Sequence, residues 1–302
     1  MAGNNYVCSP MNYIGGKYKI LPQILPLFPK EINNFVDLFC GGCNVGINVK
    51  AKRIIFNDNL NYLISLYQKF QHTETNNVLD YVDKRISDLK LSLTNNNGYL
   101  TLRKQYNKDR EPLDLFLLTA YSFNHQIRFN NNHEFNNPFG RERSCYNARM
   151  KNNLINFLDK LHNESVSFSC NNFDEFDLSF LSENDFVYCD PPYLITTGTY
   201  NDGKRGFTGW NDKQEYKLLE ILDIINLKKV KFALSNVLIH KGKENSILKN
   251  WIERNNYYVE HLNKNYSNSN YHTKNKDIHS TDEVLITNYN PLGIHYSLFS
   301  RE

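Results

Sequence analysis

The stretch 185–193, a short apolar run followed by two prolines, constrains the fold of this 302-residue chain more than any other segment. Its first half has the pattern of a buried strand that ends at Asp190. Pro191 and Pro192 lack an amide hydrogen and fix φ, so neither a helix nor further strand pairing can continue through them. Ligands of open α/β sheets bind beyond the carboxyl ends of the strands. We therefore expect Asp190, the carbonyl groups beside the prolines and the ring of Tyr193 to lie at a ligand-binding edge.

The groups at this turn suit methylation of an adenine amine. The exocyclic amine of adenine is a poor nucleophile, because its lone pair is delocalised into the ring. Rigid acceptors such as the Asp190 carboxylate and a proline-linked carbonyl would localise that lone pair, while Tyr193 stacks on the base. The electrophile would be the sulfonium methyl group of S-adenosylmethionine, with positioning and preorganised charge supplying much of the rate. The turn alone leaves open a second interpretation, in which it only ends a strand and Asp190 caps a neighbouring group.

Composition favours one large α/β domain, or one with a sizeable insertion, because 40% of the residues are hydrophobic and 14% are aromatic. No apolar run approaches the about 20 residues that a membrane helix needs, and the first residues lack a signal-peptide pattern. We expect a cytoplasmic protein without membrane contact. The six cysteines are scattered, and the CxxC pattern at 40–43 has no second pair or nearby histidines, so we expect no metal site.

The net charge of +3 is weak for a nucleic-acid binder, but the basic residues are unevenly distributed. Residues 228–276 hold ten Lys or Arg against three Glu, and residues 103–151 hold nine against five acids. Partial basic faces of this kind suit a phosphate backbone. An ordinary solvated surface is the alternative for both stretches.

Two glycine-containing turns lie near the start of the chain. Gly15 and Gly16 let backbone pass close to a ligand, and Lys17 begins an apolar-periodic segment that predicts a helix. Residues 35–39 predict a compact strand, and the Gly-rich turn 40–46 should lead into another helix. Strand, Gly-rich turn and helix bring backbone N–H groups up to nucleotide-like ligands. The turn has neither the GxGxxG nor the phosphate-cradling pattern, which favours a ligand without phosphate.

Asp58 ends the next predicted strand, 53–58, about 20 residues after the Gly-rich turn begins, where an acid usually accepts hydrogen bonds from ribose hydroxyls. Residues 59–70 have helical periodicity. We therefore expect this acid and the Gly-rich turn to serve the same ligand.

Strand–helix alternation fades over residues 73–165. We predict an amphipathic helix at 78–93, a turn at 95–98 and a buried helix at 113–121. Residues 123–141 mix amides, guanidinium groups, His and Phe around Asn-rich turn chemistry, and amides and guanidinium groups read base edges in the major groove. We interpret 73–165 as an inserted helical and hairpin module for substrate recognition; a purely structural subdomain is the alternative.

The remaining chain returns to short strands and helices. Residues 166–170 predict a strand, beyond which Phe173 could flank an adenine ring. The other predictions are helices at 154–161, 213–225 and 248–254, a Thr- and Gly-rich mobile loop at 196–209, a strand at 231–235, and a closing hairpin of 257–262 and 283–287 around a flexible basic loop at 263–280.

By its order of motifs, the chain resembles the adenine-N6 DNA methyltransferases of the Dam type, the alpha group. That order is Gly-Gly-Lys, F-x-G-G, an acidic strand end, a recognition insert and then Asp-Pro-Pro-Tyr, and it spans residues 12–290. The matching stretches are 12–17, 37–44, 57–58, 124–141, 188–193, 234–236 and 282–285. The resemblance implies a Rossmann-like, mostly parallel methyltransferase sheet with a reversed strand at its edge. It also implies a catalytic domain in two parts, 1–72 and 166–302, around a target-recognition insert at 73–165.

The resemblance further implies roles for individual residues. The catalytic residues would be Asp190, Pro191, Pro192 and Tyr193. The residues around S-adenosylmethionine would be Tyr13, Lys17, Asp37, Phe39, Gly41, Asp58, Phe173 and Asp190. The DNA-binding residues would be Asn12, Asn124, Gln126, Arg128, Asn130, Pro138 and Arg141. Arg128 is the best candidate for a bidentate guanine contact. Tyr13 stands where the family has Trp, and Cys43 where a second glycine is common.

The implied reaction is methyl transfer to N6 of adenine in double-stranded DNA after base flipping. Family members that methylate GATC often carry Lys where Asn12 stands and Leu where Gln126 stands, so GATC is only a candidate target. The alternatives are cytosine N4 in DNA, adenine N6 in RNA, and a catalytically silent DNA-binding relative. We expect a monomer that acts alone or beside a cognate restriction endonuclease, with no direct contact between the two implied.

Overall fold

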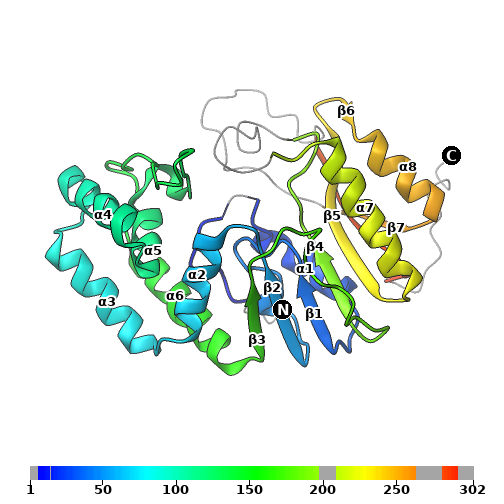
Figure 1. Ribbon diagram of the computed structural model, residues 1–302, viewed down its shortest axis with the longest axis horizontal. Helices are drawn as coiled ribbons and strands as arrows, with labels where there is room; N and C mark the ends of the chain where they lie inside the picture. The colour runs from blue at the N-terminus through cyan, green and yellow to red at the C-terminus, as the bar shows by residue number, and fades with distance from the viewer. Residues whose placement is uncertain (1–5, 14, 197–208, 263–280, 292–302) are drawn as a thin grey trace.

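The computed structural model describes residues 6–13, 15–196, 209–262 and 281–291, which form a mixed α/β fold around a central sheet (Figure 1). The sheet has eight strands in the order β3-β2-β1-β4-β5-β8-β7, and β6 pairs with the end of β5. The predicted mixed α/β class is confirmed. The strands are β1 (Asn34–Asp37), β2 (Arg53–Asn57), β3 (Val166–Ser169), β4 (Phe186–Cys189), β5 (Lys231–His240), β6 (Lys243–Glu244), β7 (Tyr258–Leu262) and β8 (Thr281–Thr287).

The chain builds the sheet outward from β1 in both directions. β2 and β3 follow on one side, β4 and β5 on the other, and all five strands are parallel. β8 then pairs antiparallel with β5 and with β7, as the predicted closing hairpin requires. The strand order reverses between β1 and β4, and ligands of open α/β sheets bind beyond the strand ends at such a point. Asp37 and Asp190 lie at this point.

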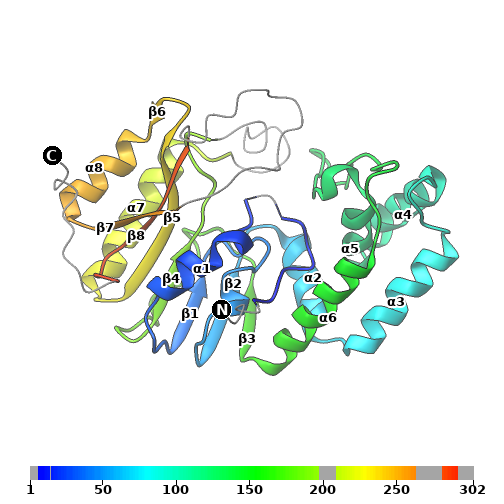
Figure 2. The same ribbon diagram turned by 180° about the vertical axis from the view of Figure 1, so that it is seen from behind.

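Alternating side chains of the sheet build two hydrophobic cores, one on each face. Phe35 and Phe56 pack with the short helix α1 and with α2, whereas Val36 and Val187 pack with α7 and α8 on the opposite face (Figure 2). None of the helices in the described ranges is long and apolar enough to cross a bilayer. The helices are η1 (Tyr18–Ile20), α1 (Leu21–Ile24), η2 (Leu25–Leu27), η3 (Gly46–Asn48), α2 (Asn61–Gln71), α3 (Thr75–Asp88), α4 (Asn96–Asp109), α5 (Pro112–Tyr121), η4 (Phe123–His125), α6 (Ala148–Asn163), α7 (Asp212–Leu227) and α8 (Ser246–Asn255).

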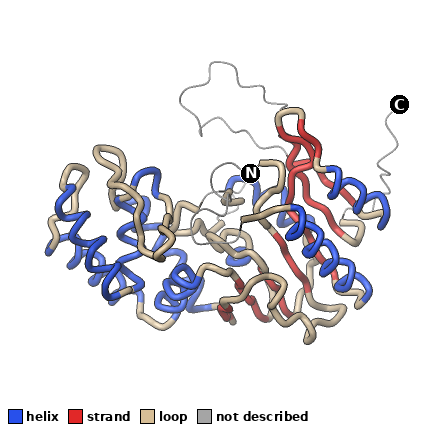
Figure 3. The backbone as a smooth tube through the Cα atoms, turned by 45° about the horizontal axis from the view of Figure 1, so that its top comes forward, coloured by secondary structure: helices blue, strands red, loops and turns tan. Residues whose placement is uncertain are grey.

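Helices α3 to α6 gather at the end of the sheet beyond β3, away from β7 and β8 (Figure 3). Asp114, on the buried helix α5, ties α3 to this group. Its carboxylate accepts hydrogen bonds from Arg85 Nε and a terminal Arg85 nitrogen at 2.9 and 2.7 Å, and from the Tyr81 hydroxyl at 2.9 Å. Between α5 and α6, antiparallel bridges join Ser122 to Phe139 and Phe129 to Phe135. The predicted helix at 78–93 is thus present with shifted bounds, as α3, the helix at 113–121 lies within α5, and the two bridges join the arms of the predicted hairpin.

Several predicted elements were wrong. Residues 95–98 do not form a free turn but begin α4, because the Asn95 side chain caps the helix by accepting from the Gly98 amide at 3.0 Å. The Gly-rich turn leads only into η3 and not into an α-helix, since residues 38–52 must hold both the turn and the return to β2. β5 continues past residue 235 to His240, because β8 pairs with it across a bulge between Val237 and Ile239.

Two predicted mobile loops fall largely or wholly outside the described residues. The first is 196–209, of which 197–208 are not described, and the second is 263–280.

Candidate active site

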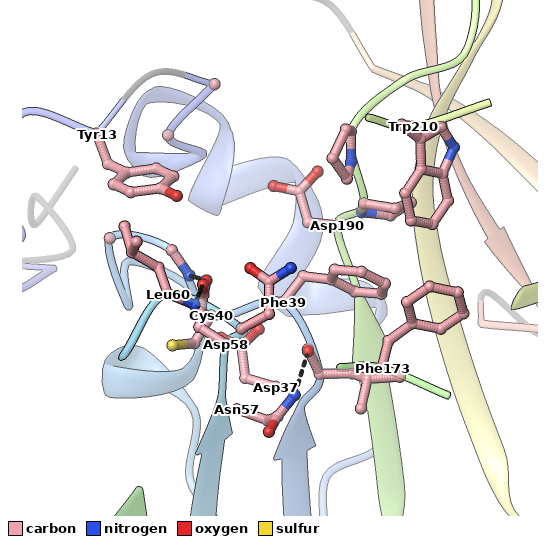
Figure 4. Close-up of a pocket in the computed structure, with 18 of the residues that line it drawn as sticks. Tyr13, Asp37, Phe39, Cys40, Asn57, Asp58, Leu60, Phe173, Asp190 and Trp210 are labelled. Atoms are coloured by element: carbon pink, nitrogen blue, oxygen red, sulfur yellow. Dashed lines mark hydrogen bonds between the residues drawn. The ribbon is translucent and has the colours of Figure 1, made fainter. Parts of the chain in front are cut away.

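A pocket of about 960 Å³ opens at the carboxyl edge of the sheet. The segments that follow β1, β2 and β4 line it, and so do residues 126–129 of the helical module. Figure 4 shows Asp37, Asp58 and Asp190 among the lining side chains, with Tyr13 and Trp210 on either side of Asp190. The three strand-end acids predicted from the sequence therefore meet in one pocket.

Asp190 follows β4 directly, and side chains hold both of its carboxylate oxygens. Lys17 Nζ lies 2.7 Å from Oδ2, and the Tyr193 hydroxyl donates to Oδ1 at 2.9 Å. Glu283, on β8, completes the cluster, since its Oε1 lies 3.2 Å from the Tyr193 hydroxyl and 3.7 Å from Lys17 Nζ. Lys17 and Glu283 are 3% and 1% exposed, whereas Asp190 is 20% exposed and lines the pocket with Pro191 and Pro192.

Burial shapes the acid–base properties of this cluster. It raises the pKa of Asp190 above the ordinary aspartate value; the Lys17 ammonium offsets part of this rise and the charge of Glu283 adds to it. Burial also raises the pKa of the Tyr193 hydroxyl well above its usual value, so Tyr193 remains a hydrogen-bond donor. Because N–H donors stabilise an ionised carboxylate, an amine that binds in the pocket would stabilise the charged form of Asp190.

Asp58 anchors the Gly-rich turn. Its Oδ2 accepts from the Gly41 amide at 3.0 Å, and its Oδ1 accepts from the Leu60 amide at 2.9 Å. Burial raises the pKa of Asp58, and these backbone bonds offset part of the rise. Gly41 has φ +44°, and a Cβ there would come within 2.8 Å of a ring carbon of Tyr13. The turn thus needs glycine at this position, so that the Tyr13 ring can lie against the backbone beside the pocket.

Asp37 is 2% exposed, and one of its carboxylate oxygens lacks a partner. Oδ2 accepts from the Gly46 amide at 3.3 Å, but Oδ1 has no hydrogen bond to any described residue. Burial raises the pKa of Asp37 well above the ordinary value, and the charge of Asp190 adds to the rise. A buried acceptor without a donor is costly, so this oxygen is a candidate ligand contact.

Three aromatic rings form one wall of the pocket. Phe39 lies 5.4 Å from Phe173 and 5.7 Å from Trp210, and Phe173 lies 5.4 Å from Trp210, between ring centroids. The Trp210 indole donates to Glu215 Oε2 at 2.7 Å. Glu215 is fully buried, and its Oε1 accepts from Asn236 and Asn245. This network fixes the indole against the other two rings.

Sequence reasoning missed two of these residues, Trp210 and Glu283. Trp210 follows a Thr- and Gly-rich loop without any pattern that places it. Glu283 interrupts an apolar strand, and a carboxylate at such a position signals a buried, paired charge. That signal was available in the sequence, but the partners of Glu283, Lys17 and Tyr193, come from two distant segments.

The predicted DNA-binding residues divide into two groups. Asn12, Gln126 and Arg128 line the pocket, and Arg128 Nε is buried with no hydrogen-bond partner in the described structure. The remaining four, which do not line it, are Asn124, Asn130, Pro138 and Arg141.

The four residues outside the pocket differ in their exposure and in the hydrogen bonds of their side chains. Asn124, Pro138 and Arg141 are exposed. The Asn130 side-chain oxygen Oδ1 accepts from the backbone amides of Asn132 and Glu134 at 3.0 and 2.9 Å, and its side-chain nitrogen Nδ2 donates to Glu134 Oε2. Asn130 is therefore engaged in its own hairpin turn.

Comparison with known proteins places this geometry in a family. Residues 13–283 match the D12 class N6 adenine-specific DNA methyltransferases. The chain is 53% identical to modification methylase StsI from Streptococcus sanguinis over 284 residues. The matched region covers 94% of this chain and 43% of that protein. The chain is also 52% identical over 286 residues to type II methyltransferase M.FokI from Planomicrobium okeanokoites, with 95% and 43% covered. The chain thus spans less than half the length of these two relatives.

A more distant relative is matched along nearly its whole length. The DNA adenine methylase of Escherichia coli (strain K12) is 28% identical over 280 residues, which cover 91% of this chain and 93% of that protein. The predicted resemblance to Dam-type enzymes is confirmed, and the family match reaches from the Gly-Gly-Lys segment to Glu283. The chain belongs to the D12 class N6 adenine-specific DNA methyltransferase family.

Proposed function

We propose that this chain transfers the methyl group of S-adenosylmethionine to N6 of adenine in double-stranded DNA. The observation that carries the proposal is the Asp190 carboxylate, which follows a central strand, precedes two prolines and lines a large pocket with Tyr193. Family membership supports the same reaction.

We also infer that the sheet is Rossmann-like and that residues 73–165 are a target-recognition insert between catalytic segments 1–72 and 166–302. The order of the parallel strands and the reversed β8 support the first inference. The gathering of α3 to α6 beyond β3 supports the second, because residues 126–129, between α5 and α6, line the pocket together with the strand ends.

The chemistry of the pocket lining would suit S-adenosylmethionine. When bound, this cofactor supplies an electrophilic methyl group on a positively charged sulfur, and it carries an amino group and ribose hydroxyls as donors. Asp37 would accept through its unpartnered Oδ1, and Asp58 would receive ribose hydroxyls beside Gly41. Phe39, Phe173 and Trp210 would flank the adenine ring of the cofactor. Tyr13 and Lys17 would border the site between cofactor and target base.

The proposed mechanism follows from the geometry at Asp190. A stacked adenine cannot reach Asp190, so the base must flip out, which costs a few kcal/mol. Tyr193 would offset part of this by stacking, worth about 1–3 kcal/mol per base. Asp190 and a proline-linked carbonyl would accept hydrogen bonds from the two N6–H groups and so localise the lone pair of the amine. The bound cofactor would supply the methyl group to N6 and leave as a neutral thioether, and the alkylated amine would then lose a proton to Asp190 or to solvent.

We propose that the protein is a cytoplasmic monomer whose partner is double-stranded DNA. The relatives' names, modification methylase and type II methyltransferase, favour a role beside a cognate restriction endonuclease over a solitary one. The partial basic stretch at 103–151 lies within the proposed recognition insert. The basic residues of this stretch would attract the phosphate backbone of DNA.

The direct test is to incubate unmethylated genomic DNA with the pure protein and S-adenosylmethionine, then to sequence it with detection of N6-methyladenine. Methylation at one short motif is the expected result and also delivers the target sequence. Methyl groups on cytosine N4, found by mass spectrometry of the nucleosides, or on RNA alone would refute the proposal. So would a folded, cofactor-bound protein that modifies nothing.

Replacing Trp210 with Phe should remove most of the change in tryptophan fluorescence that S-adenosylmethionine causes. The chain has only two tryptophans, so Trp251→Phe is the matched control. Trp251 packs against Phe232 and Tyr257 away from the pocket, and its replacement should leave the change intact. Equal changes in the Trp210→Phe variant and in the wild type would place the cofactor elsewhere.

Replacing Arg128 with Ala should weaken discrimination at one base pair by about 1–3 kcal/mol, because a bidentate guanine contact would be lost. The measurement is the ratio of kcat/KM between the target duplex and duplexes with a single substitution. Arg141→Ala is the comparison, since Arg141 is 73% exposed and lies outside the pocket. Uniformly weaker binding to all duplexes in Arg128→Ala would instead mark a phosphate contact.

A further inference from the structure

In the proposed reaction an oxygen of Asp190 must accept the target amine, yet both oxygens are already bound. Lys17 Nζ lies 2.7 Å from Oδ2, and the Tyr193 hydroxyl donates to Oδ1 at 2.9 Å. Tyr193 must also turn its ring face toward the base to stack on it. A carboxylate oxygen can accept a second hydrogen bond, but Asp190 would accept the amine more strongly if another acceptor took these two donors when the adenine enters.

Glu283 is placed to be that acceptor. Its Oε1 lies 3.2 Å from the Tyr193 hydroxyl and 3.7 Å from Lys17 Nζ, so both donors can reach it with small side-chain movements. Glu283 sits within β8, which pairs with β5 and β7, so its backbone is fixed on both sides. We propose that Glu283 is a positioning residue that takes over Lys17 and Tyr193 and so frees Asp190 for the target amine; this inference rests on the proposed function.

The charges around the cluster agree with this role. Glu283 is 1% exposed, and a buried carboxylate is tolerated only when it is paired. Lys17 would remain paired on moving from Asp190 to Glu283, and the Asp190 carboxylate would be left to the target amine. The neighbouring β8 residues Val284 and Leu285 pack into opposite hydrophobic cores, where apolar residues supply the packing.

The test compares Glu283→Gln with Asp282→Asn in single-turnover methylation. Asp282 is the adjacent residue of β8, is 30% exposed and pairs with His261 at 2.7 Å, so its variant controls for substitution in the strand. Glu283→Gln should lower the methyl-transfer rate about 10- to 100-fold, the range expected for a hydrogen bond to a charged group. The affinity for S-adenosylmethionine, measured by calorimetry, should stay at the wild-type value, as should the rate of Asp282→Asn.

A double-mutant cycle with Tyr193→Phe separates positioning from a scaffold role. Without the Tyr193 hydroxyl one of the two donors is gone, so the rate loss from Glu283→Gln should become smaller in that background. If Glu283→Gln does not fold, as judged by circular dichroism, Glu283→Asp gives the same comparison, because its shorter side chain draws the carboxylate away from both donors. Equal losses in both backgrounds would overturn the proposal.

The rate–pH profile gives a second readout that a structural defect would not move. The titratable groups that act on Asp190 or feel its charge are Lys17, Tyr193, Glu283, Asp37, Tyr13, Tyr188 and Cys189. Glu283 helps to raise the pKa of Asp190, so Glu283→Gln should shift the acid limb to lower pH. An unshifted limb, or a wild-type rate in Glu283→Gln, counts against the inference alone, whereas an inactive wild type refutes the proposed function.

Discussion

Replacing Asp190 with Asn should lower kcat for methyl transfer by about 10²–10³-fold, the cost of removing one preorganised polar group from a reacting centre. The substitution keeps the size of the side chain but replaces an acceptor with an amide nitrogen, which would face the target amine donor to donor. The fold should survive, because Lys17 keeps Glu283 as a second carboxylate partner 3.7 Å away. Single-turnover rates on the target duplex measure the effect.

Asp177→Asn is a suitable control for the Asp190 variant. Asp177 is exposed, lies outside the pocket and accepts from the Ser179 amide at 2.8 Å. It should keep the wild-type rate. Both variants should bind S-adenosylmethionine and unfold at similar temperatures. Turnover near the wild-type level in Asp190→Asn would show that the carboxylate is not needed and would remove the central residue from the mechanism.

The edge of the sheet was predictable from the sequence because it depends on local patterns. Apolar runs that end in Asp37, Asp58 and Asp190 predict strands, and the carboxyl ends of parallel strands meet at one edge. The two prolines after Asp190 mark where β4 must stop. Each of these signals lies within a few residues, so it can be recognised without knowledge of the tertiary structure.

The site residues that the sequence did not predict depend on contacts between distant segments. Glu283 meets Tyr193 across 90 residues of sequence, and the meeting is set by how β8 pairs with β5. Trp210 takes its place from the buried Glu215 network, whose members lie on α7, on β5 and before α8. The DNA contact of Asn130 stays a prediction; its side chain is also engaged in a hairpin turn, a use that composition cannot reveal.

Replacing Tyr193 with Ala should lower kcat/KM for the target duplex by about 1–3 kcal/mol, which corresponds to roughly 5- to 150-fold. The expected loss is that of a stacking surface for the flipped base. The Tyr193 ring also lies 5.1 Å from Lys17 Nζ, so its removal loosens the contact that holds the ammonium over the pocket. Kinetics with the target duplex and with non-target DNA should show the loss only for the target.

Tyr193→Phe separates the ring from the hydroxyl. Phe keeps the stacking face but cannot donate to Asp190 or Glu283, the two bonds that the hydroxyl makes at 2.9 and 3.2 Å. If stacking is the main contribution, Phe should lose much less activity than Ala. Equal losses in Phe and Ala would mean that the hydroxyl matters and the ring does not. That result would place Tyr193 in the hydrogen-bond network of the reaction and would leave the flipped base without its proposed stacking partner.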